Sequence, residues 1–396
     1  MKFLPVFLLL VFITNSSIAQ SFNYIKGKIV DGETGVAIPN ASIFITNTTK
    51  GTVSNSLGEF ELTDVPAGSY DLVASSIGYE TQVYSYKANQ LPLRLLVKMQ
   101  PKPEELEGVT VEPFEKDGWE KWGNFFIDNF IGTAGNPKDC SIKNYKSLRF
   151  RNSKKKNQLT VISAEPLMIE NKALGYTIQY QLEEFSYNFK SNTLVYFGYA
   201  LFNELHAKGP KSWQLKNRET AYSGSITHFM RSLYHNQLAA VGFEVKRLVK
   251  TTNLEKERVK KLFRENAGAA TFPKDSSEYY NRVFRQPDML EAYGKSLLTS
   301  DSLLTPVDSI TKNLSFGDFL YIVYKKEKED PSYLLYTHEN RKPFYQRSVA
   351  FLPNGNSVLV DGIGNYYMPQ DFMSYGYWAW SEKIRAMLPL DYKLQH

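Results

Sequence analysis

Two of the five histidines have a spacing that could place them together. His228 and His235 are seven residues apart, so on a helix they would share one face. Two neutral imidazoles can bind a metal, but no carboxylate stands at ligand spacing beside them. We therefore expect a structural or surface role for both, and the sequence predicts no metal site.

Known catalytic motifs are missing or incomplete. Neither His-Glu-x-x-His nor Gly-x-Ser-x-Gly occurs. Gly294-Lys295-Ser296 resembles the end of a phosphate loop, but Met289 occupies the position of the required first glycine. Glu183 and Glu184 are adjacent on an expected strand and should point to opposite faces, so they do not form a glycosidase pair. We assign no catalytic, cofactor-binding or metal-binding residue, and we expect no cofactor.

Two clusters could serve binding. The aromatic cluster near the C-terminus is expected to pack the terminal helix onto a sheet, with a sugar-stacking platform as the alternative. The basic run is expected to be a solvated hairpin loop, with contact to anionic lipid or polysaccharide as the alternative. Few aromatic residues interrupt that run, so we expect no nucleic-acid partner. The aromatic cluster comprises Tyr366, Tyr367, Phe372, Tyr375, Tyr377, Trp378 and Trp380, and the basic run comprises Lys143, Lys146, Arg149, Arg151, Lys154, Lys155 and Lys156.

The first 19 residues have the layout of a secretory signal peptide. Lys2 supplies the positive start, an apolar run follows from Phe3 to Ile13, and Ser17-Ile18-Ala19 places small residues before an expected cleavage at Gln20. The apolar run is too short to span a bilayer, and no comparable run follows. We expect an exported protein, periplasmic or associated with the outer membrane, without a transmembrane span in the mature chain.

Length and charge predict two modules. The 396 residues carry 47 Lys and Arg against 41 Asp and Glu, a net charge of +6. Residues 21–113 carry 7 basic and 11 acidic side chains, whereas residues 114–396 carry 39 and 30. The single cysteine, Cys140, excludes a disulfide scaffold. We predict a smaller acidic domain over residues 22–100, a Pro-rich and charged linker over 101–113, and a larger basic domain over 114–396.

Residues 22–100 read as short strands between turns, which is typical of an all-β sandwich. Strand-like runs such as 25–30, 41–45 and 70–74 are separated by Gly, Pro, Asn and Asp. The segment also resembles the carboxypeptidase regulatory-like domain, a transthyretin-like (prealbumin-like) sandwich. The resemblance rests on Gly27, Ile38-Pro39, Ala41, Gly51-Thr52, Gly58, Phe60, Pro66, Gly68 and Ile77-Gly78-Tyr79.

This resemblance implies seven strands and an accessory role rather than catalysis. A zinc carboxypeptidase would need a His-x-x-Glu pair and a distant histidine. None of the five histidines has a glutamate three residues later. The sequence therefore argues against peptidase activity, although this domain also accompanies such enzymes.

Residues 114–396 predict an α+β domain with antiparallel strands. Aromatic residues from Trp119 to Phe130 are spaced as on a helix, and strands are expected over 148–150, 159–163, 175–189 and 193–205. Helices follow over 213–240, a charged and partly helical segment over 244–266, and an irregular insertion over 267–318. Further strands are expected at 319–324, 333–336, 348–352 and 358–360, before a terminal helix over 377–388.

The preferred function is a non-catalytic cell-envelope protein that binds a protein partner or a glycan through both domains. The alternative is a hydrolase of an unrecognised type that acts on peptide or glycan, with the sandwich as its accessory domain. Acid and base residues need not be close in sequence, so the alternative stays open. Two carboxyl groups that face a common pocket about 5–10 Å apart would support it, and their absence together with no activity on envelope polymers would exclude it.

Overall fold

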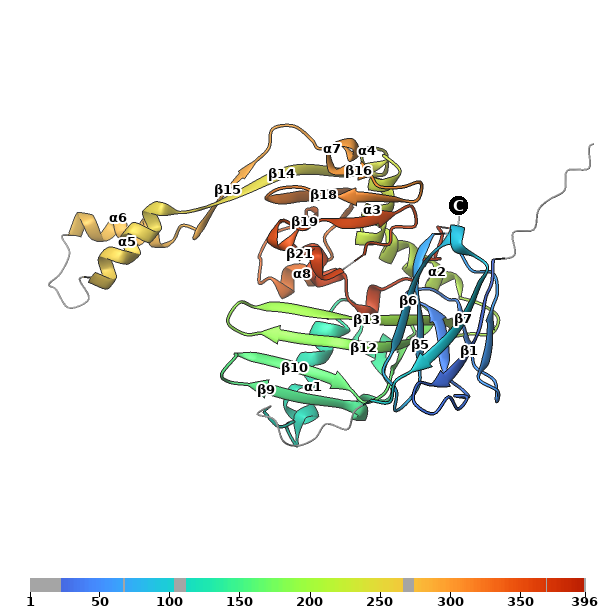
Figure 1. Ribbon diagram of the computed structural model, residues 1–396. Coiled ribbons are helices and arrows are strands. Elements are labelled where there is room, and N and C mark those ends of the chain that lie inside the picture. Colours follow the sequence, from blue (N-terminus) through green and yellow to red (C-terminus); the bar gives the residue numbers. More distant parts are fainter. Residues whose placement is uncertain (1–22, 67, 103–111, 266–273, 368, 395–396) are drawn as a thin grey trace, which may run out of the picture.

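The computed structural model describes residues 23–66, 68–102, 112–265, 274–367 and 369–394 (Figure 1). The predicted signal peptide, residues 1–19, and most of the predicted linker, residues 101–113, lie outside the described residues. Both assignments therefore remain predictions.

The first part of the chain forms a sandwich of two sheets, as predicted. One sheet has the order β4-β1-β7, with β1 antiparallel to β4 and parallel to β7. The other has the order β3-β2-β5-β6 and is antiparallel throughout. The strands are β1 (Ile25–Asp31), β2 (Ser42–Ile45), β3 (Gly51–Val53), β4 (Glu59–Leu62), β5 (Ser69–Ser75), β6 (Gln82–Lys87) and β7 (Leu93–Met99).

The sandwich core comes from apolar residues on both sheets. In the pairing of β2 with β5, Ile43 lies opposite Ala74 and Ile45 lies opposite Leu72, and all four side chains are fully buried. Gly27 is required where β1 passes β7, because a Cβ there would lie 2.2 Å from the backbone oxygen of Leu95.

The α+β region begins with a six-stranded antiparallel sheet that helix α1 (Gly118–Phe130) covers. Phe126 and Phe130 on α1 are fully buried, and Phe126 packs against Phe185 with ring centroids 4.8 Å apart. The predicted helical aromatic stripe is therefore a core face. The strands are β8 (Cys140–Ile142), β9 (Leu148–Ser153), β10 (Gln158–Ser163), β11 (Leu167–Asn171), β12 (Tyr176–Asn188) and β13 (Thr193–Glu204).

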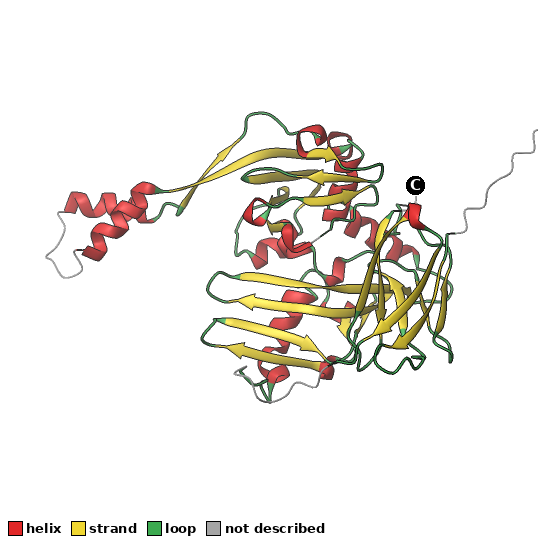
Figure 2. Cartoon of the chain, in the orientation of Figure 1, coloured by secondary structure: helices red, strands yellow, loops and turns green. Residues whose placement is uncertain are grey.

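Two further antiparallel sheets share a second core with helix α3. Strands of the larger of these sheets lie in the upper part of Figure 2, in yellow. Phe229, Met230 and Leu233 on α3 are fully buried in it. The five-stranded sheet comprises β15 (Met289–Tyr293), β14 (Phe243–Thr252), β18 (Phe319–Lys328), β19 (Tyr345–Phe351) and β21 (Met373–Gly376), and the three-stranded sheet comprises β16 (Leu304–Pro306), β17 (Thr311–Leu314) and β20 (Val358–Asp361). The helices are α2 (Ser212–Tyr222), α3 (Ile226–Tyr234), α4 (Leu238–Val241), α7 (Ser300–Leu303), α8 (Pro331–Tyr336) and α9 (Tyr377–Ser381).

An arm projects away from the body of the molecule (Figure 1). The outer part of β14 pairs with β15 as a two-stranded ribbon, and the ribbon carries helices α5 (Leu254–Glu265) and α6 (Lys274–Phe284) at its end. All five residues of β15 are exposed, so the ribbon has no covering layer.

Four sequence predictions in this region are wrong or incomplete. Residues 267–318 are not an irregular insertion, because they include α6, β15, α7, β16 and β17. These strands were not predicted from the sequence because β15 buries neither face and because β16 and β17 are only three and four residues long. The segment from residue 244 begins as strand β14 and becomes helical only at Leu254.

Residues 333–336 belong to helix α8 rather than to a strand. Pro331 occupies the first turn, and the Asp330 side chain accepts a hydrogen bond from the Ser332 N–H at 2.8 Å. This cap outweighs the strand preference of the aromatic residues. The terminal helix ends at Ser381, and the chain then packs onto the end of α1, with the Arg385 N–H donating to the Ile131 carbonyl at 3.1 Å.

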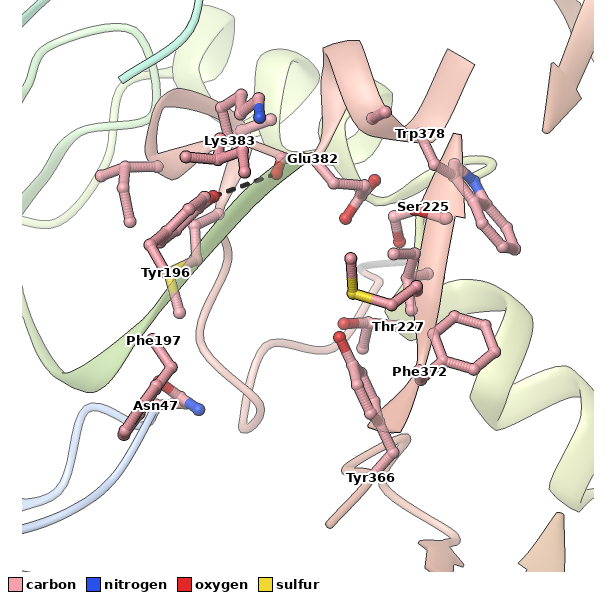
Figure 3. A pocket seen from close by; sticks show the side chains of 18 of the residues that line it. Asn47, Tyr196, Phe197, Ser225, Thr227, Tyr366, Phe372, Trp378, Glu382 and Lys383 are labelled. Atoms are coloured by element: carbon pink, nitrogen blue, oxygen red, sulfur yellow. Dashed lines mark hydrogen bonds between the residues drawn. The ribbon is translucent and has the colours of Figure 1, made fainter. Parts of the chain in front are cut away.

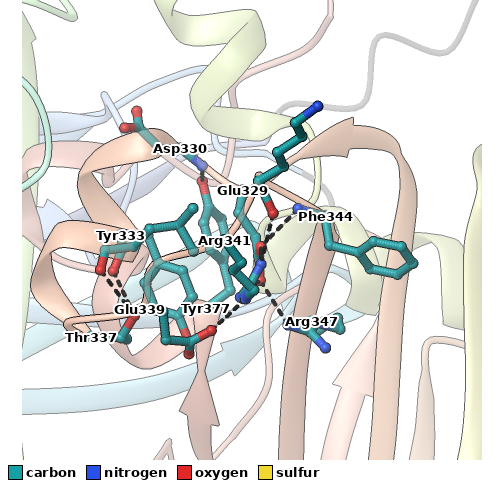
Figure 4. A network of polar contacts seen from close by, with 11 residues as sticks. Glu329, Asp330, Tyr333, Thr337, Glu339, Arg341, Phe344, Arg347 and Tyr377 are labelled. Carbon is teal, nitrogen blue, oxygen red and sulfur yellow. Dashed lines mark hydrogen bonds and ion pairs between the residues drawn. The ribbon is translucent and has the colours of Figure 1, made fainter.

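A buried ion-pair network holds α8 between β18 and β19 (Figure 4). Glu329, whose side chain is 1% exposed, receives hydrogen bonds from both terminal nitrogens of Arg341, at 2.5 and 3.0 Å, and from the Phe344 N–H at 2.9 Å. Burial raises the pKa of Glu329, but these donors outweigh burial and leave its pKa lowered. The carboxylate is therefore ionised and fully partnered.

Candidate functional site

The candidate site is a cavity of about 880 Å³ at the junction of the sandwich, the six-stranded sheet and the second core. Asn47 comes from the sandwich, Tyr196 and Phe197 come from β13, and Ser225 and Thr227 come from the start of α3. Figure 3 shows these side chains on opposite sides of an open space. No single stretch of sequence builds the site.

Aromatic rings form much of the cavity wall. Tyr366 and Phe372 pack together with centroids 5.6 Å apart, and Trp378 lies beyond them. Burial raises the pKa of Tyr196 and of Tyr366, so both hydroxyl groups keep their protons and are able to donate hydrogen bonds. The wall therefore offers flat apolar faces with a few polar groups between them.

Glu382 is the acidic group of the cavity and follows directly after α9. Its carboxyl group accepts a hydrogen bond from the backbone N–H of Ile226, the first residue of α3, and projects into the cavity beside Ser225. Burial raises the pKa of Glu382 to about 8, and the Ile226 hydrogen bond only partly offsets this rise. At neutral pH the protonated form of Glu382 therefore predominates.

Lys383 lies next along the chain, and burial lowers its pKa to about 8. Both residues are half-buried and line the cavity. Arg231 also reaches the wall, but its guanidinium is committed to the carbonyl oxygens of Ile363, Leu390 and Tyr392 at 2.7 to 3.0 Å. At neutral pH Lys383 remains mostly protonated, so the wall combines an uncharged carboxyl group with an ammonium group.

The C-terminal segment closes the junction. The Leu390 N–H donates to the Asn47 carbonyl at 2.6 Å, and the Asp391 carboxylate accepts from the Thr49 N–H at 3.1 Å. Leu390 is buried in the sandwich core, while Pro389 and Tyr392 line the cavity. This strap, residues 389–392, fixes the sandwich against the α+β region.

A pair of carboxyl groups that would support the hydrolase alternative is not found among the described residues that line this cavity. Glu382 is the single carboxyl-bearing side chain among the described residues that line it. The described part of the chain also contains no group of three or more His, Cys, Asp or Glu side chains placed to hold a metal.

The two histidines on α3 have structural partners. His228 is buried against Tyr222, and its Nδ1 accepts a hydrogen bond from the Gly224 N–H at 3.1 Å. Burial lowers the pKa of His228 to about 4. His235 Nε2 lies 3.0 Å from the Gly362 carbonyl oxygen. Neither ring belongs to a metal cluster of described residues.

The other motifs also lie outside the cavity. A register shift interrupts the pairing of β12 with β13 between Leu182 and Glu184, and both Glu183 and Glu184 are exposed. Lys295 and Ser296 are exposed beyond β15, and the next helix, α7, has only four residues. The Lys154–Lys156 stretch forms the exposed turn between β9 and β10.

The aromatic cluster divides between the two roles considered for it. Tyr377 and Trp380 pack against Tyr333 in a small core, as expected for the terminal helix. Tyr366, Phe372, Tyr375 and Trp378 line the cavity. The sequence did not identify Glu382 and Lys383 as site residues. They reach the cavity only because helix α9 ends at Ser381, directly before them.

Among the comparisons with known proteins, the family match concerns the sandwich. A family model of the CarboxypepD_reg-like domain matches residues 25–111, which confirms the resemblance of the first module. A search of curated proteins gave no match.

Solved structures give only weak overall similarity. A type II cohesin–X-dockerin complex from Acetivibrio cellulolyticus is 18% identical, with a TM-score of 0.18, over 29% of this chain and 79% of that chain. A protein from Bacteroides uniformis ATCC 8492, provisionally described as carbohydrate-binding, is 13% identical, with a TM-score of 0.15, over 46% and 79%. A Bacteroides fragilis NCTC 9343 protein of unknown function, provisionally described as membrane-associated, is 10% identical, with a TM-score of 0.16, over 89% and 94%. Scores this low do not establish a shared overall fold.

None of the helices in the described ranges combines the length and apolarity needed to cross a membrane.

Proposed function

We propose that this is a non-catalytic, exported cell-envelope protein that binds a glycan in the cavity between its sandwich and its α+β region. The observation that carries the proposal is the cavity itself, about 880 Å³ in volume and lined by aromatic rings with a few polar groups. Small-molecule sites typically combine such a volume with mostly apolar walls and a few oriented polar groups.

The aromatic wall suits the apolar faces of sugar rings. Tyr366 lies on one side, with Phe372 and Trp378 beside it but almost fully buried in the second core, and Tyr196 and Phe197 face it across the opening (Figure 3). Rigid aromatic side chains supply contact area at a small cost in conformational entropy. The Tyr366 hydroxyl provides a donor for sugar oxygens, and the Tyr196 hydroxyl, which donates to the Glu382 carbonyl at 3.3 Å, provides an acceptor.

The polar groups of the wall suit a ligand rich in hydroxyl groups. Glu382 keeps its proton at neutral pH, and Lys383, whose pKa burial lowers to about 8, keeps its charge. A protonated carboxyl is both a donor and an acceptor of hydrogen bonds, which matches a sugar hydroxyl. The Lys383 ammonium group is a further donor for sugar oxygens.

Calorimetric titration of the mature protein with oligosaccharides released from envelope polysaccharides tests the proposal. Tyr366→Ala is expected to weaken binding about tenfold, because truncating a central aromatic contact commonly costs more than 1 kcal/mol. Tyr366→Phe keeps the ring and separates its contribution from that of the hydroxyl. Tyr293→Ala is the matched control, since Tyr293 lies on the arm ribbon, away from the cavity lining.

Glu382→Gln distinguishes binding from hydrolysis. If the wild type releases reducing ends from the bound oligosaccharide and this variant binds it without cleavage, the protein is a hydrolase and the proposal is wrong. If no oligosaccharide binds and a protein is instead recovered by crosslinking at the cavity rim, the glycan assignment fails. Equal affinities of wild type and Tyr366→Ala would place the glycan elsewhere.

A further inference from the structure

Two neighbouring hairpin turns on the six-stranded sheet form a basic surface that the cavity does not explain. The β9–β10 turn carries Lys154, Lys155 and Lys156, and the β12–β13 turn carries Phe189 and Lys190. Strand β10 pairs with β12, and the Phe189 N–H donates to the Asn157 carbonyl at 2.8 Å, which holds the two turns together. These five side chains, Lys154, Lys155, Lys156, Phe189 and Lys190, are here called the hairpin-tip surface.

The lysines of the hairpin-tip surface are free to meet an anionic partner. All four are exposed, and none forms an ion pair with any residue in the described ranges. Lys154 helps to lower the pKa of the nearby Glu115, but that carboxylate is already paired with Lys121 at 2.7 Å. Within the described ranges, no ion pair therefore neutralises the positive charge of the two turns.

An aromatic cluster reaches the surface at the same place. The Phe189 ring is 37% exposed, although its centroid lies within 5.7 Å of the rings of Trp122, Phe125 and Tyr187. Packing on Trp122 and Phe125 of α1 holds the ring in position, so little conformational entropy remains to be lost on contact. A rigid, exposed aromatic ring beside lysines suits the interface between lipid headgroups and acyl chains.

We infer that the hairpin-tip surface binds a bilayer that contains anionic phospholipids. The lysines would contact the headgroup phosphates, and Phe189 would enter the interface between them. A single exposed ring does not provide the successive stacking platforms of a single-stranded nucleic-acid site. The inference does not depend on the cavity or on its glycan.

Flotation with lipid vesicles tests the inference. The full mature chain is expected to float with phosphatidylcholine vesicles that contain phosphatidylglycerol and not with phosphatidylcholine alone. Binding should be lost near 1 M salt, where the screening length is about 3 Å. The combined variant Lys154→Gln, Lys155→Gln and Lys156→Gln should lower the partition coefficient at least about tenfold, because each lysine near an anionic surface contributes about fivefold.

Two further variants separate this surface from nonspecific charge effects. Phe189→Ser should weaken partitioning several-fold and leave the salt dependence unchanged, because it removes apolar contact and no charge. The matched control changes Lys256, Lys260 and Lys261 on the arm to Gln and should float like the wild type. Both variants should bind the cavity ligand with wild-type affinity.

Several outcomes would overturn the inference. The inference is wrong if the wild type does not float with anionic vesicles, or if it binds neutral and anionic vesicles equally. It is also wrong if the arm control loses as much vesicle binding as the variant with Lys154, Lys155 and Lys156 replaced. Binding to a soluble anionic polysaccharide without any binding to vesicles would also overturn it and would assign the surface to that polymer. Circular dichroism of each variant confirms that the comparison is made between folded proteins.

Discussion

At the residue scale, the chemistry of this protein concentrates at Glu382. Its carboxyl group accepts the Ile226 N–H at the start of α3, and burial nevertheless raises its pKa to about 8. A raised carboxyl pKa means that the folded state holds a proton that the unfolded state releases. Ionisation of Glu382 therefore opposes folding.

This pKa shift predicts a pH dependence that Glu382→Gln removes. The wild type should lose stability as the pH rises from about 4.5, the ordinary value for glutamate, to about 8. The glutamine keeps the acceptor for Ile226 without a charge, so the variant should gain stability relative to wild type between pH 5 and pH 9. Urea unfolding of the wild type and of Glu382→Gln at pH 5 and at pH 9 measures this difference in the free energy of unfolding.

The exposed Glu184→Gln is the control for that experiment. Its difference from wild type should change far less between pH 5 and pH 9, because Glu184 lies in solvent. A Glu382→Gln difference that is the same at pH 5 and pH 9 would contradict the buried, protonated carboxyl.

At the element scale, α8 depends on its connections as well as on its own sequence. Six residues are too few for a stable isolated helix, so the Asp330 cap and the Glu329 network must hold it between β18 and β19. Glu329 is 1% exposed, whereas Arg341 is 29% exposed, so the carboxylate is the group that cannot reach water if the pair is broken.

Arg341→Ala should therefore destabilise the protein by about 3 kcal/mol, since it leaves a buried carboxylate without its main partner. Arg258→Ala provides the comparison, because the Arg258–Glu255 pair has a similar 2.6 Å separation but lies exposed on the arm. Exposed pairs typically contribute less than about 1 kcal/mol. Equal losses for the two variants, measured by urea unfolding, would show that burial of Glu329 does not matter.

At the scale of the whole molecule, the strap joins the two parts of the fold. Leu390 enters the sandwich core, Asp391 binds Thr49, and Arg231 on α3 donates to the Leu390 and Tyr392 carbonyls. Tyr367 adds a hydrogen bond from its hydroxyl to the Ser69 carbonyl. These contacts cross between regions far apart in sequence.

Removal of residues 389–396 should consequently uncouple the sandwich from the α+β region. We expect two calorimetric unfolding transitions in place of one, and Leu390→Ala alone should cost at least about 2 kcal/mol. Deletion of residues 393–396 is the control and should preserve a single transition. A single transition of unchanged midpoint in the longer deletion would show that the strap does not couple the two regions.

The sequence by itself determined the elements whose signals are local. The sandwich strands β1 to β5, the aromatic helix α1 and the long hairpin of β12 and β13 were predictable, because alternation, helical spacing and turn residues act within a few positions. The arm ribbon and α8 were not predictable, because β15 has no buried face and α8 depends on its cap and on the Glu329 network.

Only the tertiary structure decided the candidate site. The sequence marked Tyr366, Phe372 and Trp378 as an aromatic cluster, but it gave no reason to join them with Asn47, Tyr196 and Glu382. Those residues meet because the strap, β13 and the start of α3 converge at one junction. The burial that raises the pKa of Glu382 is a property of that junction, and no local pattern of residues encodes it.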